Sequence, residues 1–155
     1  MEHVQGAVDR IKGRHPGADN DFWKIARAMG KMTDSERIRS IKAGFSIGVA
    51  DAAKQAFQMT SQNLGELLNI SVATYERRRR DDKKLDPAAS ERLARIAQVA
   101  LQAEEVFESA QAASEWMRTP NAALGGESPV MHCETDIGAQ QVRRILASLE
   151  WGGVV

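Results

Sequence analysis

The sequence predicts an all-α fold, and three observations support this prediction. Apolar residues recur at intervals of three and four along most of the 155-residue chain, a spacing typical of amphipathic helices. No segment alternates apolar and polar residues for long enough to predict a strand. Aromatic residues are few, with three Trp, one Tyr and four Phe. The core therefore has to consist mainly of Leu, Ile, Val, Met and Ala, which suit helices better than sheets.

Two short helices are expected at the start of the chain. The apolar stripe of the first consists of Val4, Val8 and Ile11. Glycines and Pro16 within residues 13–17 end this helix. The apolar stripe of the second consists of Phe22, Ile25, Ala26 and Met29. Gly30 follows and ends it.

Two further helices are expected between Thr33 and Phe57. Thr33 and Glu36 have the spacing of a capping box, in which each side chain bonds a free backbone N–H group at the start of a helix. Ile38 and Ile41 lie on one side of this third helix, which ends at Gly44. The fourth helix begins near Ser46, and its apolar residues are Val49, Ala53, Ala56 and Phe57.

Residues 61–80 predict a fifth and a sixth helix that form a helix-turn-helix. The fifth runs from about Gln62 to Leu68 and the sixth from about Val72. Gly65 has no side chain and lets the second helix approach, Asn69 tolerates a left-handed turn, and Ser71 can cap the next helix. The residues expected to face inward are Leu64, Leu68, Ile70 and Tyr75.

The sixth helix is the candidate recognition helix, because its exposed first turn would face a DNA groove. The residues best placed to reach base edges or phosphates are Ser71, Ala73, Thr74, Arg77 and Arg78. Gln62 and Asn63 precede them as candidate phosphate contacts. Alternatively, Arg77–Arg80 form only a solvated face, diluted by two aspartates. Arg78 also occupies a position at which many such motifs bury an apolar residue.

The C-terminal half is expected to hold three more helices. Asp86-Pro87 begins the longest, since Asp caps free N–H groups and Pro fits the first helical position. Its periodic positions are Leu93, Ile96, Ala97, Ala100, either Ala103 or Glu104, and Phe107. A helix over Ala110–Arg118 and a loop or short turns over 119–135 follow. The last helix begins near Asp136, with Val142, Ile145, Leu146 and Leu149 on its apolar face.

The formal net charge of zero conceals two oppositely charged halves. Residues 1–85 hold 16 Lys and Arg against 11 Asp and Glu, a balance of +5. Residues 86–155 hold 5 against 10, a balance of −5. This asymmetry indicates two modules with different partners, of which only the first suits a polyanion. Chance scatter in a small protein is the alternative.

The sequence also indicates the cellular location of the protein. No apolar run approaches the roughly 20 residues that span a bilayer, so we expect no membrane association. The first residues lack a basic region followed by an apolar stretch, which argues against a secretory signal. Cys133 is the only cysteine and cannot form an internal disulfide. These features together predict a cytoplasmic protein.

Beyond the helix-turn-helix, the order of residues resembles antitoxins of the Xre/MbcA/ParS type. The first part of the likeness is Tyr75-Glu76-Arg77-Arg78, Lys84-Leu85-Asp86 and Ser90-Glu91-Arg92-Leu93-Ala94-Arg95. The second is Ala113-Ser114-Glu115-Trp116-Met117, Thr119-Pro120-Asn121, Leu124-Gly125-Gly126, Pro129 and Thr135-Asp136-Ile137-Gly138-Ala139. The likeness spans most of residues 45–155. It implies a helix-turn-helix domain at 45–88 and a toxin-binding domain at 89–155. Residues 1–44 are then a helical extension whose role the likeness leaves open.

The resemblance implies a bacterial antitoxin that neutralises a RES-domain toxin consuming NAD and represses its own operon. A homodimer is expected, because one small recognition helix reads too few bases and paired half-sites restore specificity. Similar antitoxins block the NAD pocket of the toxin with their C-terminal domain, so no catalytic residue and no cofactor are expected. The toxin-binding positions implied are Trp116, Asn121, Leu124, Gly125, Gly126, Trp151, Gly152, Gly153, Val154 and Val155. Gly125-Gly126 would let a backbone approach closely and offer unshielded N–H groups. Alternatively, Trp116 packs in the core and the glycines serve only turns.

Two other functions compete with this one. A stand-alone helix-turn-helix regulator could use its acidic half for dimerisation or ligand sensing. A small enzyme could be built around His132-Cys133-Glu134, but adjacent residues rarely place a thiolate beside its base, and no second Cys or His lies at ligand spacing. Gly125-Gly126 lacks the Lys-Ser/Thr pair of a phosphate loop. Glu104, Glu105 and Glu108 form either a solvated face or a contact with a basic partner.

Overall fold

The computed structural model describes residues 21–152, and within this range the chain is all-α, as predicted. The helices, in chain order, are α2 (Asp21–Gly30), α3 (Asp34–Ala43), α4 (Ile47–Ala56), α5 (Ser61–Leu68), α6 (Val72–Arg80), α7 (Pro87–Phe107), α8 (Ala110–Arg118), the 3₁₀ turn η1 (Ala122–Leu124), α9 (Pro129–His132) and α10 (Asp136–Glu150). Extended pairing in the described range is limited to one isolated antiparallel bridge, Ser46 with Lys84. The helix predicted around Val4, Val8 and Ile11 lies outside the described residues.

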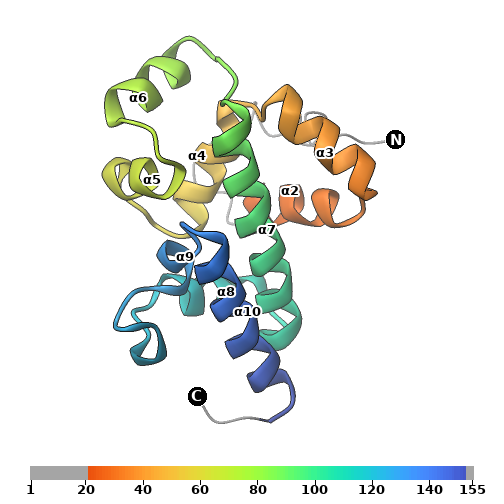
Figure 1. The fold of residues 1–155 in the computed structure, drawn as a ribbon. Helices are drawn as coiled ribbons and strands as arrows, with labels where there is room; N and C mark the ends of the chain where they lie inside the picture. The colour runs from red at the N-terminus through yellow and green to blue at the C-terminus, as the bar shows by residue number, and fades with distance from the viewer. Residues whose placement is uncertain (1–20, 153–155) are drawn as a thin grey trace.

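Helix α7 forms the centre of the molecule (Figure 1). It packs against α2 and α3 on one side, against α5 of the helix-turn-helix, and against α8 and α10 of the C-terminal part. Its buried face consists of Leu93, Ala94, Ile96, Ala97, Val99, Ala100 and Ala103. The alanines on this face allow neighbouring helices to approach closely on several sides. One hydrophobic core therefore continues through both halves of the described chain.

Aromatic side chains from α2 and the end of α4 form a cluster within this core. Phe22, Trp23 and Phe57 meet edge to face, with ring centroids 5.2–6.2 Å apart. Each is almost completely buried. The Trp23 indole N–H donates to Ser114 Oγ in α8 at 3.1 Å. α2 is therefore joined directly to the C-terminal part of the molecule.

The predicted helix starts are confirmed by their caps. Side chains of Thr33, Ser46, Ser71 and Asp86 each accept a backbone N–H from the first turn of the helix that follows. α5 begins slightly earlier than predicted, at Ser61, because Thr60 caps it. On α3, Ile41 packs against the core, but Ile38 is 52% exposed. No residue of α3 is fully buried, because this helix lies at the edge of the molecule (Figure 1).

The predicted boundary between residues 88 and 89 falls within the first turn of α7. The helix continues from there and contacts elements on both sides of that boundary. Residues 21–44 of the predicted helical extension form α2 and α3, which also pack on α7. A central helix shared in this way fixes the orientation of the helix-turn-helix relative to α8–α10.

Candidate functional site

The turn between α5 and α6 has the geometry that the sequence predicted. Asn69 adopts a left-handed conformation, with φ 56° and ψ 47°. The Ile70 N–H donates to the Gly65 carbonyl at 2.9 Å. A Cβ atom on Gly65 would lie 2.6 Å from Ile70 O, too close for any side chain. Gly65 therefore packs directly against the backbone of the turn that leads into α6, and only glycine fits at this position.

Helix α6 is fixed by its cap and by one buried side chain. Ser71 Oγ accepts the Thr74 N–H at 3.0 Å, which caps the helix start. Tyr75 is completely buried, and its hydroxyl donates to Asp51 of α4. Arg79 also pairs with Asp51, Nε to Oδ2 at 3.3 Å. Burial, followed by the bond to Asp51, raises the pKa of Tyr75 far above its ordinary value, so the phenol stays protonated.

Five of the seven predicted DNA-contact residues are exposed along α5 and α6, which contact each other. Ser61 Oγ donates to Glu76 Oε1 at 3.5 Å, which places the start of α5, with the exposed Gln62 and Asn63, beside the middle of α6. The other predicted residues that are exposed are Ser71, Ala73 and Arg77. Thr74 is half-buried and receives a bond from Ser71 Oγ at 2.8 Å.

Arg78 has a structural contact that sequence reasoning missed. Its Nη1 donates to the Lys84 carbonyl at 2.6 Å, and the side chain is half-buried. This bond explains how an arginine occupies a position at which an apolar residue is common. Val72 was also missed: it is 41% exposed at the first position of α6, where an apolar side chain can contact a thymine methyl group. Its β-branched side chain next to the Ser71 cap is the signal that could have identified it.

The C-terminal loop over residues 121–127 is closed by Asn121. Its side chain accepts the Ala123 N–H at 2.9 Å, and its carbonyl accepts the N–H groups of Leu124 and Gly126 at 3.0 and 2.9 Å. The Gly125 N–H donates to Ala122 O at 3.2 Å. The expectation of unshielded glycine N–H groups was therefore wrong, because the loop itself uses them.

The two glycines are nonetheless required by the backbone and leave open space in front of it. Gly125 and Gly126 have φ of +68° and +87°, values that favour glycine. A Cβ atom at either position would meet no atom within 4 Å among the described residues. A partner could thus approach this backbone closely without meeting a side chain. Leu124, in contrast, is buried and supports the loop from inside.

Trp116 is partly used by the core, as one of the two alternatives from the sequence predicted. It is half-buried and packs against Phe107, with ring centroids 5.5 Å apart. Trp151, at the end of α10, is 87% exposed. Gly152 follows it with φ +78°, and Gly153, Val154 and Val155 lie outside the described residues. Ile137, which sequence reasoning missed, is 71% exposed in the first turn of α10.

The residues of the rejected enzyme site do not form a catalytic arrangement. Cys133 is completely buried, and its thiol donates to the Pro129 carbonyl at 3.3 Å. Burial raises the pKa of Cys133 to about 12, so its thiol is neutral. His132 contacts other groups, Glu127 Oε1 through Nδ1 at 2.7 Å and Gln141 Oε1 through Nε2 at 2.5 Å. Within residues 21–152, no group of three His, Cys, Asp or Glu side chains is arranged to hold a metal ion.

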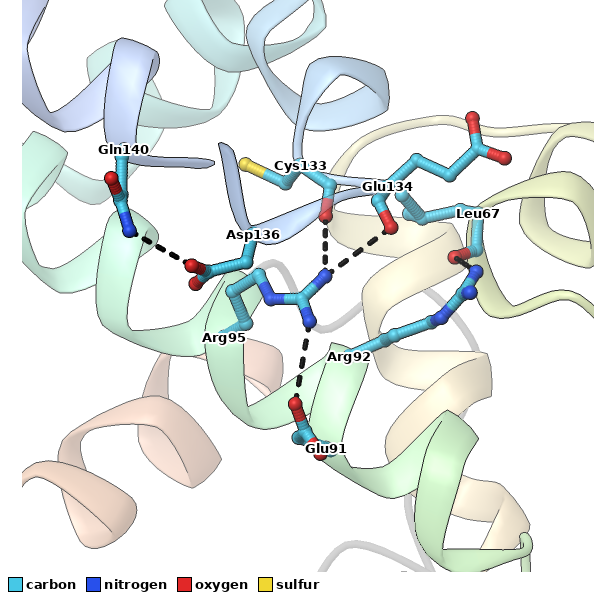
Figure 2. A network of polar contacts seen from close by, with 8 residues as sticks. All are labelled: Leu67, Glu91, Arg92, Arg95, Cys133, Glu134, Asp136 and Gln140. Carbon is cyan, nitrogen blue, oxygen red and sulfur yellow. Dashed lines mark hydrogen bonds and ion pairs between the residues drawn. The ribbon is translucent and has the colours of Figure 1, made fainter. Parts of the chain in front are cut away.

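Two arginines of α7 join the helix-turn-helix to the C-terminal part (Figure 2). Arg92 Nη1 donates to Leu67 O near the end of α5 at 3.2 Å. Arg95 Nη1 donates to the carbonyls of Cys133 and Glu134, at 3.3 and 3.2 Å, just after α9. The Arg95 guanidinium also pairs with Glu91 at 3.4 Å. α7 thus binds backbone carbonyl groups at the ends of helices on both sides of it.

These features define the class of protein: an all-α chain in which a helix-turn-helix shares a central helix with a smaller helical domain. No helix in the described range is long and apolar enough to cross a membrane. Residues 36–98 match the family described as the antitoxin Xre-like helix-turn-helix domain. Residues 102–152 match the antitoxin Xre/MbcA/ParS C-terminal toxin-binding domain.

Whole-chain comparisons agree with both matches. The chain is 34% identical over 116 residues to an antitoxin Xre of Yersinia enterocolitica, covering 74% of this chain and 78% of the relative. It is 26% identical over 135 residues to the Prs ADP-ribosylating antitoxin of Sphingobium sp., covering 81% and 85%. An antitoxin Xre of Photorhabdus laumondii is 24% identical over 113 residues, covering 72% and 76%. The chain belongs to the Xre antitoxin family.

Proposed function

We propose that this chain neutralises a RES-domain toxin that consumes NAD, by covering the active site of the toxin with its C-terminal domain. The observation that carries the proposal is the match of residues 102–152 to a toxin-binding domain whose end presents the exposed Trp151. The Sphingobium relative is named for ADP-ribosylation, a reaction that takes its ADP-ribose from NAD. Steric occlusion requires no catalytic group in the antitoxin itself.

The contact with the toxin would involve two features of the C-terminal domain. The open backbone of Gly125 and Gly126 allows a partner to approach closely. Trp151 offers a large exposed aromatic side chain of the kind that anchors interfaces. The residues after it, 153–155, are proposed to extend into the toxin pocket. Asn121 and Leu124 would support the glycine loop from within, and the exposed part of Trp116 would add to the contact.

A second part of the proposal is that the chain represses its own operon. The exposed surface of α6 and the start of α5 would enter the major groove and contact its phosphates. A recognition helix of nine residues reads few base pairs, so a homodimer with two half-sites would supply the remaining specificity. Both the toxin substrate and the operator are found in the bacterial cytoplasm, which we infer as the location of the protein.

Co-expression with a RES-type reading frame adjacent to its gene tests toxin neutralisation. The chain is expected to restore growth and to co-purify with the toxin. Trp151→Ala should raise the antitoxin level required for neutralisation by at least about fivefold, as loss of an interface anchor typically costs more than about 1 kcal/mol. Ile38→Ala is the matched control, because Ile38 is an exposed apolar residue remote from this domain. Failure of the unmodified chain both to rescue growth and to co-purify would refute the proposal.

Gel-shift measurements on DNA from upstream of its own gene test repression. Arg77→Ala is the preferred variant, because Arg77 is exposed whereas Arg78 also supports the fold through Lys84. Loss of one arginine contact to a base typically costs about 1–3 kcal/mol. We expect weaker binding to the operator and unchanged toxin binding. Operator binding that survives Arg77→Ala combined with Arg78→Ala would exclude α6 as the recognition helix.

A further inference from the structure

The segment between α6 and α7, residues 81–86, contains two lysines that lie outside the candidate recognition helix. Lys83 and Lys84 are both exposed, and they follow the four consecutive arginines Arg77–Arg80. Asp81 and Asp82 are the acidic residues at the start of the segment, and Asp81 pairs with Arg80 at 3.4 Å. Asp86, at the end of the segment, accepts the Ala89 N–H at 2.7 Å as the cap of α7. Residues 77–86 therefore contain six basic and three acidic side chains, a balance of +3.

Hydrogen bonds to backbone groups hold this segment in one conformation. The Lys83 N–H donates to Arg78 O at 2.8 Å, and Arg78 Nη1 donates in return to Lys84 O at 2.6 Å. The backbone of Lys84 also pairs with that of Ser46 in an isolated antiparallel β-bridge, and the Leu85 N–H donates to Phe45 O at 2.8 Å. The two lysines are thus presented on a fixed backbone, which lowers the entropic cost when they bind a ligand.

The segment also brings the end of α3 close to the end of α6. A Cβ atom on Gly44 would lie 3.6 Å from Lys84 Cβ, which places the C-terminal end of α3 against the lysine. Lys42 lies two residues earlier and is exposed. Figure 1 shows the segment passing over the same end of the molecule as the end of α3. Positive charge therefore continues from α6 through Lys83 and Lys84 toward α3.

The length of α6 indicates which ligand this surface fits. Nine helical residues span about 13 Å, whereas the major groove of DNA, which the first turn of α6 would enter, is about 8.5 Å deep. A chain that leaves the C-terminal end of such a helix therefore emerges at the edge of the groove, where the phosphates lie. We propose that Lys83 and Lys84, with Lys42 beside them, bind the DNA phosphate backbone that flanks the half-site. The inference rests on the DNA binding proposed above and adds a sequence-independent contact to it.

The test compares the full chain with the variant Lys83→Ala plus Lys84→Ala. Fluorescence anisotropy with labelled duplexes, one from upstream of its own gene and one of scrambled sequence, is measured between about 50 and 200 mM salt. The variant should bind both duplexes more weakly by the same factor. The slope of log affinity against log salt should become shallower by about 0.9 for each phosphate that the variant no longer neutralises. Lys83→Arg plus Lys84→Arg, which keeps both charges, should retain the original slope.

Lys24→Ala plus Lys31→Ala is the matched control, since it removes the same charge from exposed lysines of α2 and the α2–α3 turn. An equal effect of this control would show that only net charge matters and would overturn the proposal. An unchanged affinity and slope in the Lys83 and Lys84 variant would overturn it as well, while leaving operator binding intact. If toxin co-purification disappeared instead of DNA binding, the segment would bind protein, and the inference would be wrong. If the unmodified chain bound neither duplex, both this inference and the proposed repression would fail.

Discussion

His132 is the one histidine among the described residues, and its surroundings favour the charged ring. Both ring nitrogens face side-chain oxygens, one from Gln141 and one from Glu127. An imidazole can donate to two oxygens only when it carries both protons. The bond to Gln141, and then the bond and charge of Glu127, raise the pKa of His132 above its ordinary value. These bonds join the end of the glycine loop to α10.

The first prediction is that the stabilisation from His132 declines as pH rises. A folded-state pKa above the unfolded value means that the stabilisation is complete below about pH 6.5 and declines as pH passes the folded-state value. His132→Ala should cost about 1 kcal/mol at about pH 5.5, because its hydrogen bonds are removed, and less at about pH 8.5. Urea denaturation at the two pH values measures this difference. An equal cost at both would contradict the charged ring.

Tyr75 allows a second prediction at this scale, because it is the only tyrosine in the chain. Its raised pKa, due first to burial and then to Asp51, means that the phenol stays neutral in the folded protein. Stability from this group is present below about pH 10 and disappears as pH approaches the folded-state value. Tyrosinate absorbance should therefore appear only together with the disappearance of helical circular dichroism. Ionisation near the ordinary pKa of about 10 with the helices intact would exclude the buried bond to Asp51.

At the scale of elements, three consecutive helices end in the same way. At the end of each of α4, α5 and α6, one backbone N–H donates to the carbonyl five residues earlier, and the preceding N–H donates to the carbonyl three residues earlier. Both hydrogen bonds satisfy carbonyl groups of the last turn. The residues in the left-handed conformation are Gln58, Asn69 and Asp82, with φ from 50° to 56°. None is a glycine, so each turn tolerates some backbone strain. These helix ends fix the conformation of the short turns after α4, α5 and α6, and the turn after α5 holds α5 and α6 in their mutual orientation.

Asn69 provides the prediction for this element. Asn69→Ala should destabilise the fold by about 1 kcal/mol, because alanine lacks the local hydrogen bonds that help asparagine adopt a left-handed turn. Asn69→Gly is the control and should be neutral or slightly stabilising, since glycine has no Cβ penalty there. Thermal unfolding of the two variants measures the difference. Equal melting temperatures would show that the turn is not under this constraint.

At the scale of the whole molecule, α7 makes one cooperative unit from two functional parts. Its buried face contributes to a core that runs from α2 to α10. Arg92 and Arg95 add bonds to carbonyls of α5 and of the residues after α9 (Figure 2). A protein organised around one shared helix is expected to unfold in a single transition. The helix-turn-helix and the C-terminal domain are then expected to have one common free energy of unfolding.

The corresponding prediction concerns Arg95. Arg95→Ala should destabilise the whole chain by about 1–3 kcal/mol, because two carbonyls are left without a charged donor. Urea curves followed by tryptophan fluorescence and by circular dichroism should shift together. Arg144→Ala, at an exposed position of α10, is the control and should change stability by less than about 0.5 kcal/mol. Separate transitions for the two probes would show that the halves unfold independently.

The sequence by itself determined the longer helices and the helix-turn-helix within residues 21–152, because caps, stripes and turn residues act over a few positions. The short α9 and η1 lie where it predicted only a loop or short turns. Ser71, Asn69 and Asp86-Pro87 each carry their signal locally, and each behaves as predicted. Family resemblance supplied the positions of the C-terminal loop, whose order of residues is more specific than any single spacing. The internal use of the glycine N–H groups was not predictable in this way, since it depends on how residues 121–127 close on themselves.

Only the tertiary structure decided which distant residues meet. Asp51 and Tyr75 are 24 positions apart, and Arg95 and Cys133 are 38 apart. An alanine-rich stripe such as that of α7 specifies a buried face but leaves open which neighbours pack on it, and therefore which polar groups come within reach. The packing of the helices on α7 brought Trp23 of α2 within hydrogen-bond distance of α8, and it buried Cys133. It also gave the end of α3 its position beside Lys84, because helix packing sets contacts that no local pattern encodes.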